Sequence, residues 1–396
     1  MHLYVKLRNV DCLRIATSLG SLSPLFDCII ASSAAHLSQA GHLSQEVVLQ
    51  RKSRALLSLR KAISVCQLTA NSRTDYDRHS YIQSCETNLY ASVLLVGLAV
   101  AEGTSFDETL TLIFGSAQLA KQCFKLNLQS ASDSTRSTIR CLAYFDVLTS
   151  VPYPRPPAIR LDDNCLAEYD SYEPNFLSLD PFMGCLRSIF AVITKASELL
   201  HRYFTYAIRQ DDFLSQRDSL LFYLAHWTSP SPTMFRNTTG YDWEQSHFAE
   251  LAFTCATQIY LLRSINNDLD SERILALTRT LRDSIVSIPI TSSLIAMMLW
   301  PAFVWGCESY EEVERTNVTK WFESVAAKQS FGNILVTLEA LRKIWNLQDH
   351  DFSKDDLITF TSDIAHDHSS QFSRGCGYQS SWVKLCWEHK ICLNLA

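Results

Sequence analysis

Apolar residues recur every three or four positions along most of this chain. The segment 180–204, "DPFMGCLRSIFAVITKASELLHRYF", places them at 182, 186, 189, 190, 193, 199, 200, 203 and 204. This spacing puts the apolar side chains on one face of an α-helix. The segment 241–262 repeats the design, and the alternation typical of strands is convincing in no segment. The sequence therefore predicts an all-α, multi-helical fold.

Polar residues suited to helix caps mark where several helices begin. Pro181 fits a first helical turn, and Gln245 stands three residues after its predicted N-cap, as in a capping box. We therefore expect four helices to begin at such caps. The predicted N-cap residues are Asp180, Asp242, Asp270 and Ser353.

A proline-rich stretch divides the chain. Four prolines fall within "PYPRPP" at 152–157. Proline has no backbone N–H and keeps the preceding residue out of the helical region, so an extended connector is predicted here. We predict two helical layers joined within one integrated domain. The layers are residues 1–150 at the N-terminal side and 180–396 for the middle and C-terminal section, with 151–179 as the connector.

The most apolar run, residues 294–307, carries no charge over fourteen residues. As a helix it spans about 21 Å, which is short of the roughly 30 Å hydrocarbon core of a membrane. Pro301 removes a backbone donor and kinks or breaks the helix. No membrane span is predicted; the run is interpreted as a buried, kinked helix in which Gly306 allows another group to approach closely.

Aromatic and charged residues make this run a candidate pocket wall. If the helix resumes beyond it, Glu308 and Arg315 lie two turns apart on one face, where they either bracket a common partner group or join an ion-pair network. Two tryptophans are placed to line a concave apolar pocket, the usual form of a small-molecule site. The predicted pocket residues are Trp300, Trp305, Glu308 and Arg315, although core packing is favoured for each one singly.

Composition narrows the function classes. Of 396 residues, 47% are hydrophobic and 19% are charged, which is typical of a packed globular protein. The net charge of −6 and the lack of a basic run argue against direct nucleic-acid binding, which rests on neutralising phosphates. Thirteen cysteines, an odd number without C-x-x-C spacing, indicate reduced structural thiols in an intracellular protein. Charged residues interrupt the apolar N-terminus, so no signal peptide is predicted.

Several residues could bind a metal or act as a nucleophile, but a purely structural role is favoured for each of them. His366 and His368 lie in an acidic polar stretch that is interpreted as a solvated connection, and Cys376 lies in a predicted flexible turn. Two aspartate pairs lack the matching metal-binding residues in register. They are Asp162–Asp163 and Asp211–Asp212. No phosphate-binding or nucleophile-elbow motif occurs, so neither a metal nor a cofactor is predicted.

Isolated polar residues within apolar helices carry the remaining chemistry. A buried carboxylate must find hydrogen bonds or a cation, because its desolvation costs several kcal/mol. Such groups either tie the core together or form the polar floor of a pocket, and the first interpretation is favoured. The group comprises His36, Glu102, Asp146 and Glu308. If the protein is an enzyme, the candidate acid and base groups are His36, Asp146 and Glu308.

An ordered series of motifs resembles a known family. "LWPAFVWGCES", followed by Arg315, resembles the W-P-x-x-x-x-G-x-E…R signature of the fungal-specific transcription factor domain, the helical regulatory region of fungal zinc-cluster (Zn2Cys6) transcription factors. "DCIIASSAAHLS" resembles its early helix, with His36 at the histidine position. Further similar segments are "SRALLSLRKAISVCQ", "CLAYFDVLTSVPYPRPP", "DPFMGCLRSIFAVITKASEL", "LEALRKIW" and "SWVKLCWEHKICLNLA". The six-cysteine zinc cluster that reads DNA in this family does not occur in the sequence.

Two hypotheses therefore stand. The resemblance implies a regulatory module, stand-alone or truncated, that binds a small hydrophobic effector or a protein partner in the nucleus and controls secondary-metabolite or catabolic genes, without itself binding DNA. The second hypothesis is a cytoplasmic, cofactor-independent cyclase or isomerase on the same scaffold, acting on a hydrophobic natural-product intermediate. The first is favoured over both the enzyme and an inert remnant, and a homodimer is left open.

Overall fold

A computed structural model describes residues 23–39, 41–69, 75–127, 133–159, 186–228, 242–265, 270–329, 331–362 and 381–396. Within these ranges the chain forms thirteen α-helices, one short 3-10 helix and no strand. The all-α prediction is therefore confirmed for the part of the chain that the structure describes.

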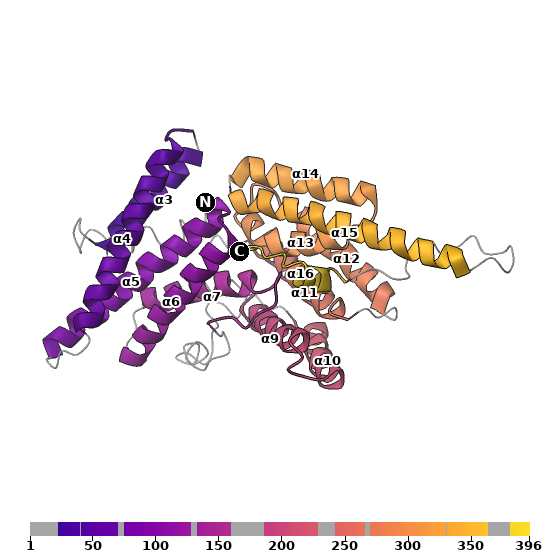
Figure 1. Cartoon of the computed structure of the whole chain (residues 1–396), viewed down its shortest axis with the longest axis horizontal. Helices are drawn as coiled ribbons and strands as arrows, with labels where there is room; N and C mark the ends of the chain where they lie inside the picture. Colours follow the sequence, from indigo (N-terminus) through magenta and orange to yellow (C-terminus); the bar gives the residue numbers. More distant parts are fainter. Residues whose placement is uncertain are drawn as a thin grey trace.

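The helices before the proline-rich stretch form one side of the molecule (Figure 1). α3 and α4 lie against each other, and both contact α5, which in turn contacts α6 and α7. These helices are α3 (Pro24–Gln39), α4 (Gln45–Thr69), α5 (Asp75–Glu102), α6 (Phe106–Asn127) and α7 (Asp133–Thr149).

The later helices form the other side, and α13 lies among them, in contact with α11, α12, α14 and α15. The 3-10 helix η4 leads directly into α13. These elements are α9 (Arg187–Phe204), α10 (Gln210–His226), α11 (Trp243–Leu262), α12 (Ser271–Ser287), η4 (Ile295–Met298), α13 (Leu299–Cys307), α14 (Glu312–Gln329), α15 (Gly332–Ser362) and α16 (Trp382–Glu388).

α5 joins two hydrophobic clusters. Val93 and Val96 belong to the large cluster that runs through both sides of the molecule, whereas Leu94 and Leu98 pack with α3 and α4 in a smaller one. The stretch Ser80–Glu102 is long and apolar enough to cross a membrane, but 83% of its most apolar window is buried among other helices. Its apolar character is accounted for by this central position in the core.

The apolar run enters the core as predicted, but its geometry differs from a kinked helix. Every residue from Leu299 to Cys307 is buried. Pro301 lies in the first turn of α13, where a missing N–H costs nothing, and η4 precedes it. Pro301 therefore lies shortly after the change from 3-10 to α-helical geometry. A Cβ on Gly306 would lie 2.6 Å from Cδ1 of Leu341, which confirms the predicted close approach.

The described part of the proline-rich connector, residues 151–159, packs against α7 and α9. The Ser197 hydroxyl of α9 donates hydrogen bonds to the carbonyls of Ser150 and Arg155, at 2.7 and 3.1 Å. His201 Nδ1 lies 3.0 Å from the Pro154 carbonyl. Because proline leaves carbonyls without helical partners, polar side chains of α9 satisfy them here.

The predicted helix starts have mixed outcomes. Asp242 caps α11 and accepts a hydrogen bond from the Gln245 backbone N–H at 3.0 Å. The capping box is not completed, because the Gln245 side chain accepts a hydrogen bond from Ser292 instead. Asp270 is the N-cap of α12 but forms no capping hydrogen bond. Ser353 lies inside α15, so the predicted start there is wrong, and Asp180 lies outside the described residues.

A backbone-to-backbone crossing joins the two sides of the molecule. Gly103 follows α5 with φ of +66°, and the N–H groups of Gly103 and Thr104 bond back to the carbonyls of Val100 and Ala99, which forms a Schellman cap. A Cβ on Gly332, the first residue of α15, would lie 2.3 Å from the Glu102 carbonyl oxygen. Only glycine permits α15 to begin this close to the end of α5.

We predict that Gly332→Ala destabilises the protein by about 1–3 kcal/mol, because the added methyl overlaps backbone that cannot rotate away. Gly115→Ala in α6 is the control. Its Cβ meets nothing within 4 Å, so the change is expected to be neutral or slightly stabilising. Urea denaturation followed by circular dichroism measures both variants. Equal midpoints for the two variants would contradict the close crossing.

Candidate functional site

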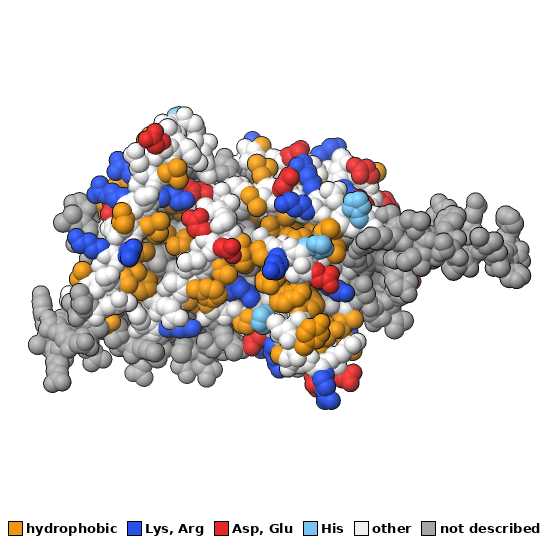
Figure 2. All heavy atoms as spheres, in the orientation of Figure 1, with side chains coloured by type: hydrophobic (Ala, Val, Ile, Leu, Met, Phe, Trp, Pro, Cys, Tyr) orange, Lys and Arg blue, Asp and Glu red, His pale blue; other side chains and the backbone are white. Residues whose placement is uncertain are grey.

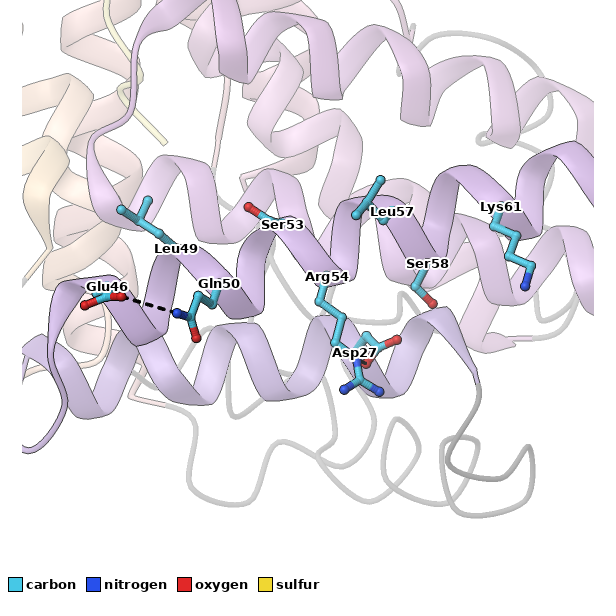
Figure 3. A pocket seen from close by; sticks show the side chains of 9 residues that line it. All are labelled: Asp27, Glu46, Leu49, Gln50, Ser53, Arg54, Leu57, Ser58 and Lys61. Carbon is cyan, nitrogen blue, oxygen red and sulfur yellow. Dashed lines mark hydrogen bonds and ion pairs between the residues drawn. The ribbon is translucent and has the colours of Figure 1, made fainter.

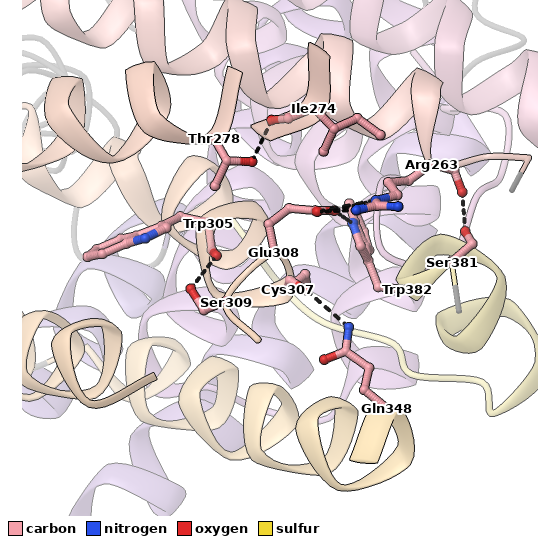
Figure 4. A network of polar contacts seen from close by, with 10 residues as sticks. All are labelled: Arg263, Ile274, Thr278, Trp305, Cys307, Glu308, Ser309, Gln348, Ser381 and Trp382. Carbon is pink, nitrogen blue, oxygen red and sulfur yellow. Dashed lines mark hydrogen bonds and ion pairs between the residues drawn. The ribbon is translucent and has the colours of Figure 1, made fainter. Parts of the chain in front are cut away.

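A buried carboxylate at the end of α13 holds three helices together (Figure 4). Arg263, the C-cap residue of α11, donates from Nε to both carboxylate oxygens of Glu308, at 2.9 and 3.2 Å, and from Nη2 at 2.7 Å. Trp382 of α16 donates its indole N–H to the same carboxylate at 2.9 Å. The side chains of Glu308 and Arg263 are only 2% and 10% exposed. The geometry satisfies both charges, as a buried ion pair requires.

Three helix ends meet around this ion pair. Ser381 caps α16, accepting from the backbone N–H of Lys384 at 3.2 Å and donating to the Arg263 carbonyl. The guanidinium of Arg263 lies by the C-termini of α11 and α13, a placement that the helix dipoles favour. The carboxylate of Glu308 lies by the N-terminus of α16 but also at the C-terminus of its own helix, α13, so the two dipoles oppose each other there.

α15 completes the site from the opposite side. Trp345 donates its indole N–H to the Gly306 carbonyl at 2.8 Å, and Gln348 donates to the Cys307 carbonyl at 3.1 Å. The Gly306 carbonyl also accepts a hydrogen bond from the Ser309 backbone N–H at 3.1 Å, so Trp345 adds a second bond to it, while Gln348 bonds a carbonyl at the very end of α13. α15 thus caps α13 with side chains.

Arg315 joins α14 to the same region but not to Glu308. Its Nε donates to the Ser309 carbonyl at 3.0 Å, and its two terminal nitrogens each lie 2.8 Å from an oxygen of Asp349. The guanidinium also lies 5.5 Å from the centre of the Trp345 ring. The condition for placing Glu308 and Arg315 on one helix face is not met, since α13 ends at Cys307 and α14 begins at Glu312.

The two predicted pocket tryptophans are core residues. Trp300 is fully buried, with ring centres of Phe253 and Tyr260 at 5.6 and 6.5 Å, and Trp305 is 2% exposed. Neither indole N–H has a hydrogen-bond partner among the described residues, so both rings contribute by packing. The structure therefore does not bring Trp300, Trp305, Glu308 and Arg315 together around one cavity.

A small cavity does lie beside η4 and α13. Its volume is about 60 Å³, and Tyr144, Phe145, Leu299 and Ile334 are among the residues that line it. Ligand pockets usually measure about 300–1,000 Å³. This cavity therefore has room for water or a methyl-sized group, not for a natural-product intermediate.

Asp146 is a second buried tie. Its carboxylate is 2.7 Å from Arg155 and accepts a hydrogen bond from the Ile159 backbone N–H at 2.8 Å. Burial raises the pKa of Asp146, while Arg155 and the Ile159 N–H oppose that shift. The residue holds the connector on α7 and, in the described structure, is in contact with neither His36 nor Glu308.

Of the other two isolated polar residues, one joins two helices and one is exposed. Glu102 pairs with Lys52 at 2.5 Å and joins α5 to α4. His36 is exposed near the end of α3, so the expectation that it sits in the core or in a pocket is wrong. Leu25, Cys28 and Ala35 form the buried face of that helix. The three candidate acid and base groups therefore do not converge.

Sequence reasoning did not identify the partners of the buried carboxylates. Arg263 follows the long apolar helix that ends "YLL". A charged residue directly after such an apolar run could have been recognised in the sequence as a candidate partner for a buried carboxylate. Trp382 was noted only as part of the C-terminal motif. Arg155 stands among prolines, where it was interpreted as connector.

No group of three or more possible metal ligands lies close together among the described residues. Asp211 and Asp212 are exposed in the first turn of α10. The remaining candidates for metal or thiol chemistry lie outside the described residues. They are Asp162, Asp163, His366, His368 and Cys376.

None of the nine described cysteines forms a disulfide within the described residues, and eight of them are buried. Burial is the largest cause that raises the pKa of Cys28, Cys66 and Cys123, each to about 12. The sulfur atoms of Cys66 and Cys85 lie 3.3 Å apart and share a hydrogen bond. These thiols are protonated at neutral pH and act as small core residues.

Two open grooves mark the surface. One, of about 630 Å³, lies between α14 and α15 and is lined by residues of both signs, including Arg315, Lys320, Glu323 and Asp349. The other, of about 710 Å³, runs along α4 beside α3 (Figure 3). The larger concave spaces described for this protein are therefore on its surface.

Fold and contacts define an all-helical domain in which buried ion pairs join helix ends and open grooves mark the surface. The chain belongs to the family of the fungal specific transcription factor domain, which it matches over residues 10–395. Membership confirms the resemblance and assigns the chain a regulatory role in transcription. Comparison with curated proteins finds no match, and comparison with solved structures finds none either.

We predict that Glu308→Ala destabilises the protein by about 3–5 kcal/mol, because it removes the carboxylate that accepts the Nε and Nη2 hydrogen bonds of the buried Arg263 guanidinium. Replacing both partners, Glu308→Leu with Arg263→Met, is expected to recover most of this loss, although Trp382 still lacks its acceptor. Glu339→Ala, in an exposed pair with Arg342, is the control and should change stability by less than about 1 kcal/mol. Urea denaturation measures all three, and similar losses for Glu308→Ala and Glu339→Ala would show that the buried pair is dispensable.

We also predict slow alkylation of the buried thiols. At pH 8, iodoacetamide should modify Cys28, Cys66 and Cys123 roughly a thousandfold more slowly in the native protein than ordinary thiols, because a pKa near 12 leaves little thiolate. The same cysteines in urea provide the control. Peptide mass spectrometry follows each site, and equal native and denatured rates would refute the buried assignment.

Proposed function

We propose that this chain is the part of a fungal transcription regulator that receives a protein partner at its surface and changes transcription in response. The proposal rests on where the residues of the family signature lie in the structure. Glu308 is committed to Arg263 and Trp382, and Trp300 is packed in the core. With these positions occupied in holding helices together, recognition is assigned to exposed surfaces.

Two further observations support a partner in preference to an enclosed effector. The cavity beside α13 measures only about 60 Å³, whereas the grooves of about 630 and 710 Å³ are open to solvent. Several large apolar side chains are also exposed, among them Leu57 and Phe222 at 66% each. Exposed apolar groups gathered on a surface are a feature of interaction sites.

The enzyme hypothesis has no specific observation in its favour. It needs an acid and a base that converge on one apolar pocket. His36 is exposed on α3, while Asp146 and Glu308 each form a separate buried ion pair. A partner that prefers one packing of the helices would instead act by shifting the population of conformations. By the family resemblance, the genes controlled would belong to secondary metabolism or catabolism.

A tethering experiment tests the proposal. We expect the full chain, fused to an unrelated DNA-binding domain in a fungal cell, to enter the nucleus and change reporter expression severalfold relative to that DNA-binding domain alone. Glu308→Ala should reduce the change because it lowers the stability of the folded domain, while Glu339→Ala should not. If the intact fusion is present in the nucleus and the reporter is unchanged, the proposal is wrong.

A further inference from the structure

The outer face of α4 presents an apolar stripe to solvent. Leu49, Leu56 and Leu57 are 59%, 42% and 66% exposed, whereas Val48 and Ala55 on the inner face are buried. Positions i, i+7 and i+8 fall on one side of a helix, so the three leucines form a single surface. An apolar residue exposed singly needs no explanation, but a group on one helix face does.

A groove follows this stripe. It has a volume of about 710 Å³, and Leu49, Ser53 and Leu57 line it, with Lys61 farther along α4 (Figure 3). Arg54 also lines it while paired with Asp27 of α3 at 2.9 Å. Leu49 and Leu57 are about 12 Å apart along the axis, or roughly two helical turns. That is the spacing of anchors on an amphipathic helix that lies in a groove.

Basic side chains greatly outnumber acidic ones on α4. The helix carries five basic side chains and one acidic one, Glu46, in a chain whose net charge is −6. Lys52 and Arg54 are paired with Glu102 and Asp27. The remaining basic side chains are exposed and have no ion-pair partner within the described residues; they are Arg51, Arg60 and Lys61. Figure 2 shows basic and hydrophobic side chains mixed over this edge of the molecule.

We propose that this α4 face binds an acidic amphipathic helix of a partner protein. Apolar side chains of the partner cover Leu49, Leu56 and Leu57, and its carboxylates meet Arg60 and Lys61. The inference rests on the proposed function, since it names the class of partner that the regulator receives.

Charge and shape argue for this occupant over others. A second copy would bring two basic α4 faces together, and like charges across an interface oppose association. A nucleic-acid backbone supplies anions but has no apolar group to cover three leucines. An acidic helix with apolar anchors satisfies both features of the surface.

A synthetic peptide tests the surface directly. The probe is a fluorescein-labelled helical peptide with leucines at positions i, i+3, i+4 and i+7 and glutamates elsewhere, titrated with the full chain by fluorescence anisotropy. We expect saturable binding that weakens with added salt. The double variants Leu49→Ser with Leu57→Ser, and Arg60→Glu with Lys61→Glu, should each raise the dissociation constant roughly tenfold or more.

The chain offers a matched control. Leu335 and Val336 of α15 are 54% and 44% exposed, so Leu335→Ser with Val336→Ser removes a comparable apolar surface elsewhere and should leave peptide binding unchanged. Circular dichroism verifies that each variant is folded, which is expected because every changed residue is exposed. The inference would be overturned if the peptide does not bind, or if a peptide with lysines in place of glutamates binds equally well. It would also be overturned if the Leu335→Ser with Val336→Ser variant weakens binding as much as the Leu49→Ser with Leu57→Ser variant. A dimer in sedimentation that Leu57→Ser dissolves would also overturn it, in favour of a second copy.

The reporter assay separates this inference from the proposed function. Suppose that the fusion changes transcription, and that the Leu49→Ser with Leu57→Ser variant gives the same reporter change and the same peptide affinity as the unmodified chain. The proposed α4 surface is then wrong and the proposed function stands. If the purified chain binds the peptide as described but the fusion leaves the reporter unchanged, the surface stands and the function is wrong.

Discussion

The ion pair between Glu308 and Arg263 is the interaction on which the later half of this fold depends. Removing a carboxylate and a guanidinium from water costs several kcal/mol for each ion, and only complete hydrogen bonding offsets that cost. Here the guanidinium makes three contacts with the carboxylate, and the Trp382 indole supplies another. The charges lie where α11, α13 and α16 end or begin. Apolar packing brings these helices together, and the ion pair selects the arrangement in which their ends coincide.

The same logic recurs on a smaller scale at Asp146. That carboxylate holds the proline-rich connector against α7, in a place where proline leaves no regular backbone bonding. Between the two ties, aromatic rings run through the core from Tyr144 through Phe190 and Phe253 to Trp300. Trp300, Gly306 and Glu308 of the family signature are thus parts of a packed interior. This packing is the reason why we propose that recognition takes place at the surface.

The outer face of α4 has the opposite character. Its leucines are placed by a helix whose inner face is already satisfied by α3 and α5, so nothing in the fold requires them. Exposing apolar and basic groups together on one helix carries a risk of nonspecific association. The acidic helical partner that we propose would cover this surface, which the buried ion pairs of the core do not use.

The sequence by itself determined the helical class, the burial of residues 299–307, the Asp242 cap and the need for partners around Asp146 and Glu308, because periodicity, hydrophobicity and desolvation act locally. Only the tertiary structure decided who those partners are, since Arg263 and Trp382 lie 45 and 74 residues from Glu308 along the chain. It also decided that His36 faces solvent, because the exposure of a helix face depends on which helices cover it. The three leucines of α4 make the same point. Their spacing is visible in the sequence, but whether that face is covered or free is a property of the assembled fold.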